Sequence, residues 1–136
     1  MKNEKTSIVS FAELLKELQP FIATEALSIS KVFKFFEAEE GWRRLPGWED
    51  MSDRHIYQCI AGGAALAGTV YIVTDVSYRP GLGVFAVNAQ DFSDFIDGYL
   101  LAYGECLING DTLIFCPESK MMVMFHHEGV FLSRQF

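Results

Sequence analysis

The segment from Asp91 to Gly104 predicts a short amphipathic helix that must pack against a core. Its apolar residues recur at intervals of three and four, the spacing that places side chains on one side of an α-helix. They are Phe92, Phe95, Ile96, Tyr99, Leu100 and Tyr103. At about 100° per residue, Asp94, Asp97 and Leu101 fall on the opposite side. Two carboxylates and a leucine are therefore expected to face water or a partner.

Segments rich in β-branched and aromatic residues lie on both sides of this helix and predict strands. These segments are residues 69–76, 83–89, 105–108, 111–116, 120–127 and 130–136. A long loop joins the first two segments, and the Asn109-Gly110 pair predicts a tight hairpin turn between 105–108 and 111–116. Because most connections are of hairpin length, the sheet is expected to be antiparallel.

The N-terminal part of the chain predicts helices. Ser10 and Glu13 form a capping-box pattern ahead of a helix that ends at Pro20. Two further helices are expected within residues 21–40 and 50–60, separated by a loop rich in Gly and Pro.

Together these elements predict an α+β fold in a single domain of residues 1–136. A helical part, residues 1–66, precedes a strand-rich part, residues 69–136, which contains the helix at 91–103. We expect an antiparallel sheet of about five to six strands, with the N-terminal helices and the inserted amphipathic helix packed on one face. The other face need not be covered, and its aromatic side chains would then form an apolar binding surface.

The net charge of −7 is unevenly distributed along the chain. Residues 1–54 carry 8 Lys/Arg and 10 Asp/Glu, whereas residues 55–136 carry 3 Lys/Arg and 8 Asp/Glu. So few basic groups cannot neutralise many phosphates, which argues against nucleic acid as a partner. A basic protein partner fits this charge, and simple solubility explains it equally well.

The cysteines and the N-terminus indicate the compartment. Cys59, Cys106 and Cys116 form no CxxC pair and are odd in number, so neither a disulfide framework nor a zinc ribbon is predicted. The N-terminus lacks the apolar core of a signal peptide, and no run of residues reaches the length of a membrane span. We therefore expect a cytoplasmic protein that does not enter a membrane.

Cysteine catalysis is one function to consider. It would require Cys106 or Cys116 as nucleophile, His126 or His127 as base, and Asp75 to orient the base. The residue types are present in the strand-rich half, but no local signature surrounds any of them. No catalytic residue is predicted, and the chain is not expected to be an enzyme.

Metal binding has less support from the sequence. His126 and His127 are neighbours on a predicted strand, so their side chains are expected to point to opposite faces. His55 and Cys59 share a helix face but supply two ligands, whereas zinc sites use three or four. No metal and no cofactor are therefore predicted.

Exposed acidic and aromatic residues indicate a binding function. Tyr78 and Arg79 lie in a long hairpin loop and are of the types that anchor interfaces. The full set of predicted partner-binding residues is Asp94, Asp97, Leu101, Tyr78, Arg79, Glu118 and Glu128. A merely solvated helix face is the alternative explanation of the helix carboxylates. Trp42 and Trp48 are expected either in the core or at an interface, and the segment 21–36 is open to the same two interpretations.

Two segments carry a family resemblance: the acidic helix of residues 91–105 and the strand and turn of residues 125–131. In these features the chain resembles bacterial immunity proteins of contact-dependent and polymorphic toxin systems. Such proteins are small, commonly acidic cytoplasmic domains that occlude the active site of a toxin. The resemblance implies a protein-binding inhibitor whose carboxylates pair with Lys and Arg of a basic, nuclease-like toxin.

Two other functions remain open. The first is a small-molecule-binding or regulatory domain that uses the aromatic face of the sheet, which a buried apolar pocket with convergent polar groups would favour. The second is the cysteine-dependent enzyme.

Overall fold

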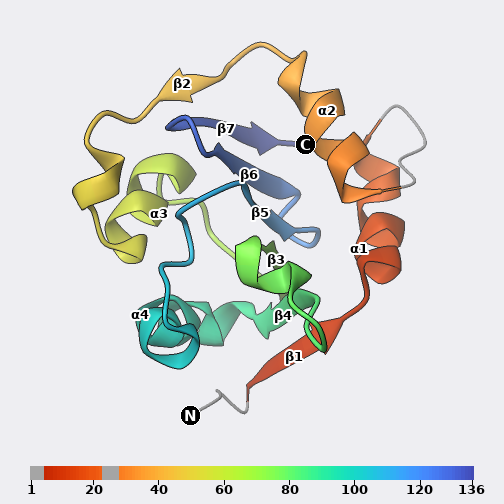
Figure 1. The fold of residues 1–136 in the computed structure, drawn as a ribbon. Helices are drawn as coiled ribbons and strands as arrows, with labels where there is room; N and C mark the ends of the chain where they lie inside the picture. The colour runs from red at the N-terminus through yellow and green to blue at the C-terminus, as the bar shows by residue number, and fades with distance from the viewer. Residues whose placement is uncertain (1–4, 23–27) are drawn as a thin grey trace.

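A seven-stranded antiparallel sheet forms the centre of the computed structural model, which describes residues 5–22 and 28–136 (Figure 1). The strands are β1 (Thr6–Val9), β2 (Arg43–Arg44), β3 (Thr69–Val73), β4 (Val84–Asn88), β5 (Thr112–Cys116), β6 (Met121–His126) and β7 (Val130–Gln135). Their order in the sheet is β1-β4-β3-β5-β6-β7-β2. The predicted α+β class is confirmed, with seven strands in the described ranges instead of five or six.

Four α-helices and four short 3₁₀ helices are present in the described residues. They are α1 (Phe11–Leu18), α2 (Ile29–Glu37), α3 (Asp53–Ala61), α4 (Phe92–Tyr103), η1 (Gln19–Phe21), η2 (Trp48–Asp50), η3 (Asp75–Tyr78) and η4 (Ala89–Asp91). Serine side chains cap the first three α-helices: Ser10, Ser28 and Ser52 each accept a hydrogen bond from a backbone N–H of the first turn. None of the described helices is long and apolar enough to cross a membrane.

The helices cover both faces of the sheet, α1 and α2 on one side and α3 and α4 on the other (Figure 1). Phe115 and Met122 belong to the core beneath α1 and α2, while Phe85 and Phe125 belong to the core beneath α3 and α4. The expectation that the helices pack on one face is therefore wrong, and the other face, which the sequence did not require to be covered, is covered as well. The central strands β5 and β6 are apolar at consecutive positions, as strands buried on both faces must be.

The predicted strand at 105–108 and the Asn109-Gly110 hairpin are also wrong, because β3 pairs with β5 in their place. The backbone N–H groups of Leu107 and Ile108 donate instead to the two carboxylate oxygens of Asp53, at 2.8 and 3.0 Å. Residues 104–111 are thus a loop tied to the start of α3. The sequence also gave no sign of β1 and β2, which lie at the two edges of the sheet and are short.

Candidate functional site

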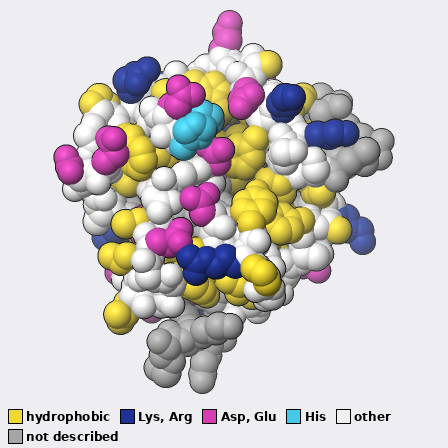
Figure 2. Space-filling view, in the orientation of Figure 1, with side chains coloured by type: hydrophobic (Ala, Val, Ile, Leu, Met, Phe, Trp, Pro, Cys, Tyr) yellow, Lys and Arg dark blue, Asp and Glu magenta, His cyan; other side chains and the backbone are white. Residues whose placement is uncertain are grey.

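Three strand ends meet at one end of the sheet and bring four carboxylates together. The pairing of Val73 with Leu113 and of Thr112 with Phe125 places the end of β3, the start of β5 and the end of β6 side by side. The segments that leave these strand ends carry Asp75, Glu105, Asp111 and Glu128, which we call the acidic cluster. Figure 2 shows acidic side chains gathered around a histidine on this face of the molecule.

The loop that carries Glu105 and Asp111 is held by buried hydrogen bonds. Asp53 is buried and accepts the two N–H groups described above. From the end of β3, the Thr74 hydroxyl donates to the carbonyl oxygen of Leu107. Gly110 lies against Asp75, since a Cβ atom at position 110 would come within 2.7 Å of that carboxylate. The position of these carboxylates is therefore fixed by the core.

Two members of the acidic cluster, Glu105 and Asp111, repel the carboxylate of a third, Asp75. The pKa of Asp75 is raised by partial burial, then by the negative charges of Glu105 and Asp111. Arg79 forms an ion pair with Glu105 and compensates part of this charge. A positively charged group placed beside Asp75 would relieve the remaining repulsion.

Two histidines border the acidic cluster. Asp111 Oδ1 lies 3.0 Å from His127 Nδ1 and accepts the His127 backbone N–H, also at 3.0 Å. Burial opposes ionisation of Asp111, but the hydrogen bonds from His127 outweigh it and lower the pKa of the carboxyl. The same side-chain hydrogen bond raises the pKa of His127. Asp111 and His127 therefore form an ion pair at the centre of the site when the histidine is protonated.

The prediction that His126 and His127 point to opposite faces is wrong. Their ring centroids lie 4.1 Å apart, with the rings tilted against each other. Strand β6 ends at His126, and His127 belongs to the turn that follows, so the alternation of a strand no longer applies. His126 Nδ1 also lies 3.7 Å from Glu128 Oε1.

Tyr78 lies at the rim of the acidic cluster. The pKa of its phenol is raised by burial, then by the charges of Asp111 and Asp75. Its ring stacks on Phe11 with centroids 5.3 Å apart, yet 60% of the residue remains exposed. Three of the predicted partner-binding residues, Tyr78, Arg79 and Glu128, thus lie at this end of the sheet.

The predicted residues on α4 form a separate surface. Leu101 is 90% exposed, and Leu100, which was expected on the buried side, is 54% exposed. Asp97 accepts hydrogen bonds from the guanidinium of Arg54 on α3, with Nε and Oδ1 2.8 Å apart, and this pairing lowers the pKa of Asp97. Asp94 is exposed on the same helix. The Asp97 carboxylate therefore has an intramolecular partner.

Asp91 lies at the N-cap position of α4 but does not cap the helix with its side chain. Its side chain makes no capping hydrogen bond and pairs with Lys5, with 3.3 Å between Nζ and Oδ1. This ion pair ties the start of α4 to the residue before β1.

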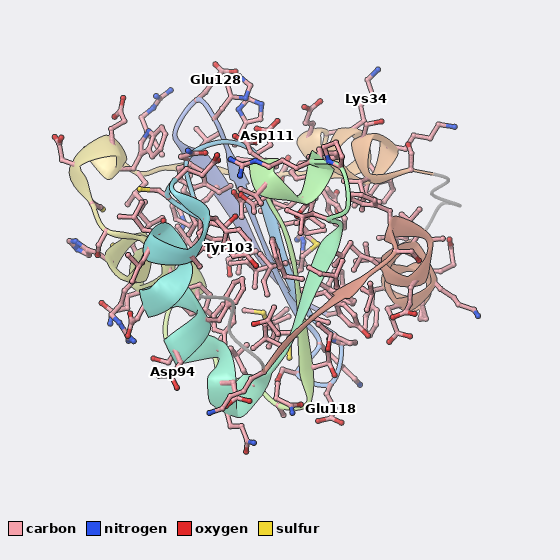
Figure 3. The ribbon with its side chains drawn as sticks, turned by 60° about the horizontal axis from the view of Figure 1, so that its bottom comes forward. Lys34, Asp94, Tyr103, Asp111, Glu118 and Glu128 are labelled. Atoms are coloured by element: carbon pink, nitrogen blue, oxygen red, sulfur yellow. The ribbon has the colours of Figure 1, made fainter. Side chains whose placement is uncertain are left out.

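Glu118 lies away from the acidic cluster. It occupies the turn between β5 and β6, and Figure 3 shows it at the other end of the sheet from Asp111 and Glu128. The predicted residues are therefore distributed over three places. Sequence reasoning missed Glu105 and Asp111 as binding residues and considered Asp75 only for catalysis. Their common signal is a carboxylate beside a strand end, but the sequence does not reveal which ends meet.

The two tryptophans contribute to packing. Trp42 Nε1 donates to the carbonyl oxygen of Phe36 at 2.9 Å. Trp48 packs edge-on against Phe125 with ring centroids 5.0 Å apart. Of the two interpretations of these side chains, the structure supports the one in which they cover the core.

The cysteines are poorly placed for nucleophilic catalysis. Cys116 is buried at the end of β5 remote from the histidines, and its Sγ lies 3.0 Å from the carbonyl oxygen of Ala67. Burial, then the charges of Asp53 and Glu105, raises the pKa of the Cys106 thiol. A raised pKa reduces the reactive thiolate, which argues against Cys106 as a nucleophile.

The turn that presents Glu128 depends on Gly129. This residue has φ +85°, and a Cβ atom here would lie 2.6 Å from Trp48 Nε1. Gly129→Ala is expected to lower the free energy of unfolding by about 2–3 kcal/mol, from left-handed strain and the displaced indole. Denaturant unfolding measures this change. Gly81→Ala is the matched control. Gly81 has φ +80°, but an added Cβ atom would meet nothing within 4 Å, so the free energy of unfolding should fall by only about 1 kcal/mol. Equal losses in both variants would contradict the role of Trp48.

The fold and the site define a small α+β protein with a charged surface at one end of a sheet covered on both faces. No family model, curated protein sequence or solved structure matches the chain at a significant level.

Proposed function

We propose that this protein is a protein-binding inhibitor that acts in the cytoplasm as a bacterial immunity protein and neutralises a basic, nuclease-like toxin. The acidic cluster is the observation that carries this proposal. Lysine and arginine side chains of the toxin would pair with Asp75, Asp111 and Glu128 and so relieve the repulsion between Asp75 and its acidic neighbours. The bound protein would then exclude the toxin's substrate.

The surroundings of the cluster support a protein partner. Tyr78 offers an exposed aromatic ring supported by Phe11, and Arg79 lies beside it, both of types enriched at interface hot spots. The loop that carries Glu105 and Asp111 is anchored by Asp53 and Thr74, so its backbone would lose little conformational freedom on binding. Long-range attraction of a basic partner would accelerate association, and the aromatic contacts would slow dissociation.

The first experiment is capture of the partner from a lysate of the source cells, with wild-type protein and with Glu128→Lys as bait. We expect wild type to retain a basic protein at low salt and to release it at high salt, because exposed charges are screened. The charge-reversed bait should retain less. The captured protein is then assayed for nuclease activity with and without an equimolar amount of this protein. Equal capture by both baits, or an active nuclease that this protein does not inhibit, would contradict the proposal.

A hollow between α3 and α4 supports the small-molecule alternative. It has a volume of about 290 Å³, and its lining includes Tyr57, Phe92 and Ile96. The Tyr57 hydroxyl is buried and has no hydrogen-bond partner among the described residues. Burial, then the charge of Cys116, raises the pKa of Tyr57 to about 12. Tyr57, Phe92 and Ile96 would give a bound small molecule apolar contacts, and mass spectrometry of the purified protein under non-denaturing conditions would detect it.

A further inference from the structure

We infer that Asp111, His126 and His127 form a binding site for a divalent transition-metal ion of the Zn²⁺ class. One ligand atom of each side chain lies within 4.8 Å of the others. The three groups come from two neighbouring strands, since β5 begins directly after Asp111 and β6 ends at His126. This inference rests on the spacing of the ligand atoms and not on the proposed inhibitor function, although both involve Asp111 and Glu128.

The spacing of the three groups suits a metal ion. Ligand atoms around a tetrahedral zinc ion lie about 3.3 Å apart, given bonds of about 2.0–2.1 Å. Asp111 Oδ1 and His127 Nδ1 are already 3.0 Å apart. His127 is exposed and His126 half-buried, so rotation of the imidazoles can bring the third ligand into place without disturbing the core.

Glu128 can complete the coordination. Its Oε1 lies 3.7 Å from His126 Nδ1, and the side chain is 73% exposed. Two imidazoles and two carboxylates are ligands typical of zinc, which binds nitrogen and carboxylate oxygen in four-coordinate sites. Four side chains can therefore act as ligands. Asp111 precedes β5, and His126, His127 and Glu128 lie at the end of β6 and in the turn that follows.

The charge around the site favours a dication. Asp75 adds negative charge beside Asp111. Burial and the charges of Glu105 and Asp111 raise the pKa of Asp75, whereas His127 lowers it. A divalent ion at Asp111 would offset this repulsion. Glu118, on the opposite turn, contributes little at that distance.

The test is titration of the full-length protein with Zn²⁺ alone, followed by calorimetry and by the ¹H–¹⁵N signals of the histidine rings. We expect one ion per chain, with shifts of the His126 and His127 rings and none of His55. His127→Gln should weaken binding at least about tenfold, because it removes one ligand from an exposed position that does not support the core.

The matched control is the double variant His55→Gln, Cys59→Ser, which removes the other histidine and the exposed cysteine. It should bind Zn²⁺ as wild type does. Loss of binding in this control, unchanged binding in His127→Gln, or the absence of any heat and of any ring shift would each overturn the inference. Circular dichroism of every variant confirms that the fold is retained.

Discussion

Replacing Asp53 with alanine is expected to lower the free energy of unfolding by about 3 kcal/mol. The buried carboxylate accepts the N–H groups of Leu107 and Ile108, and both residues are themselves fully buried. Alanine would leave two backbone donors without a partner and away from water, and a hydrogen bond to a charged acceptor contributes about 1.5–3 kcal/mol. Urea unfolding followed by tryptophan fluorescence measures the change.

Two further variants separate the role of Asp53 from a general loss of charge. Asp53→Asn keeps one acceptor oxygen and should show an intermediate loss. Asp50→Ala removes an exposed carboxylate three residues earlier and should change stability by less than about 0.5 kcal/mol. If Asp53→Ala were as stable as Asp50→Ala, the loop at 104–111 would not depend on this contact.

Charge reversal at Glu128 is expected to slow association with the partner at least about tenfold at low salt. Glu128 is exposed in the β6–β7 turn and belongs to the acidic cluster, so a lysine there would repel a basic protein as it approaches. The rate of dissociation should change less, since steering by exposed charge acts on the encounter. Surface plasmon resonance at two salt concentrations, with the captured partner immobilised, measures both rates.

Glu118→Lys is the matched control for this prediction. Glu118 is also an exposed glutamate in a hairpin turn, and the two turns lie at opposite ends of β6. The same change of charge there should alter the association rate by less than about twofold at moderate salt, because screening limits exposed charges to roughly 10 Å. Equal effects of the two variants would mean that net charge matters and the acidic cluster does not. A larger effect of Glu118→Lys would place the interface at the other end of the sheet.

The elements that depend on local periodicity were predictable from the sequence. The spacing of Phe92, Phe95 and Tyr99 defined α4, and the capping pattern at Ser10 marked the start of α1. The positions of β3, β4, β5, β6 and β7 also followed from runs of β-branched and aromatic residues. These signals are local, so they do not require knowledge of the fold.

The features that depend on contacts between distant segments were not predictable in the same way. Asn109-Gly110 is a strong hairpin signal, but the side chain of Asp53 binds the neighbouring backbone and β3 occupies the edge of β5. The acidic cluster arises from this strand order, since Asp75 and Asp111 are neighbours only when β3 lies beside β5. The sequence did contain a signal that both faces of the sheet are covered. Strands β5 and β6 lack the alternation of polar and apolar residues that an open face produces.

The pairing of β2 with β7 has a consequence for how the chain folds. Arg43 and Arg44 pair with Phe131 and Val130, so β2 closes the sheet against a strand that lies far beyond it along the chain. Strand β1 likewise cannot pair until β4, its partner in the sheet, has been made. Contacts so distant along the chain slow folding, because a long loop must close before they form. On the ribosome, the sheet can therefore be completed only after residues 130–135 have emerged, and both edges of the sheet belong to strands made before them.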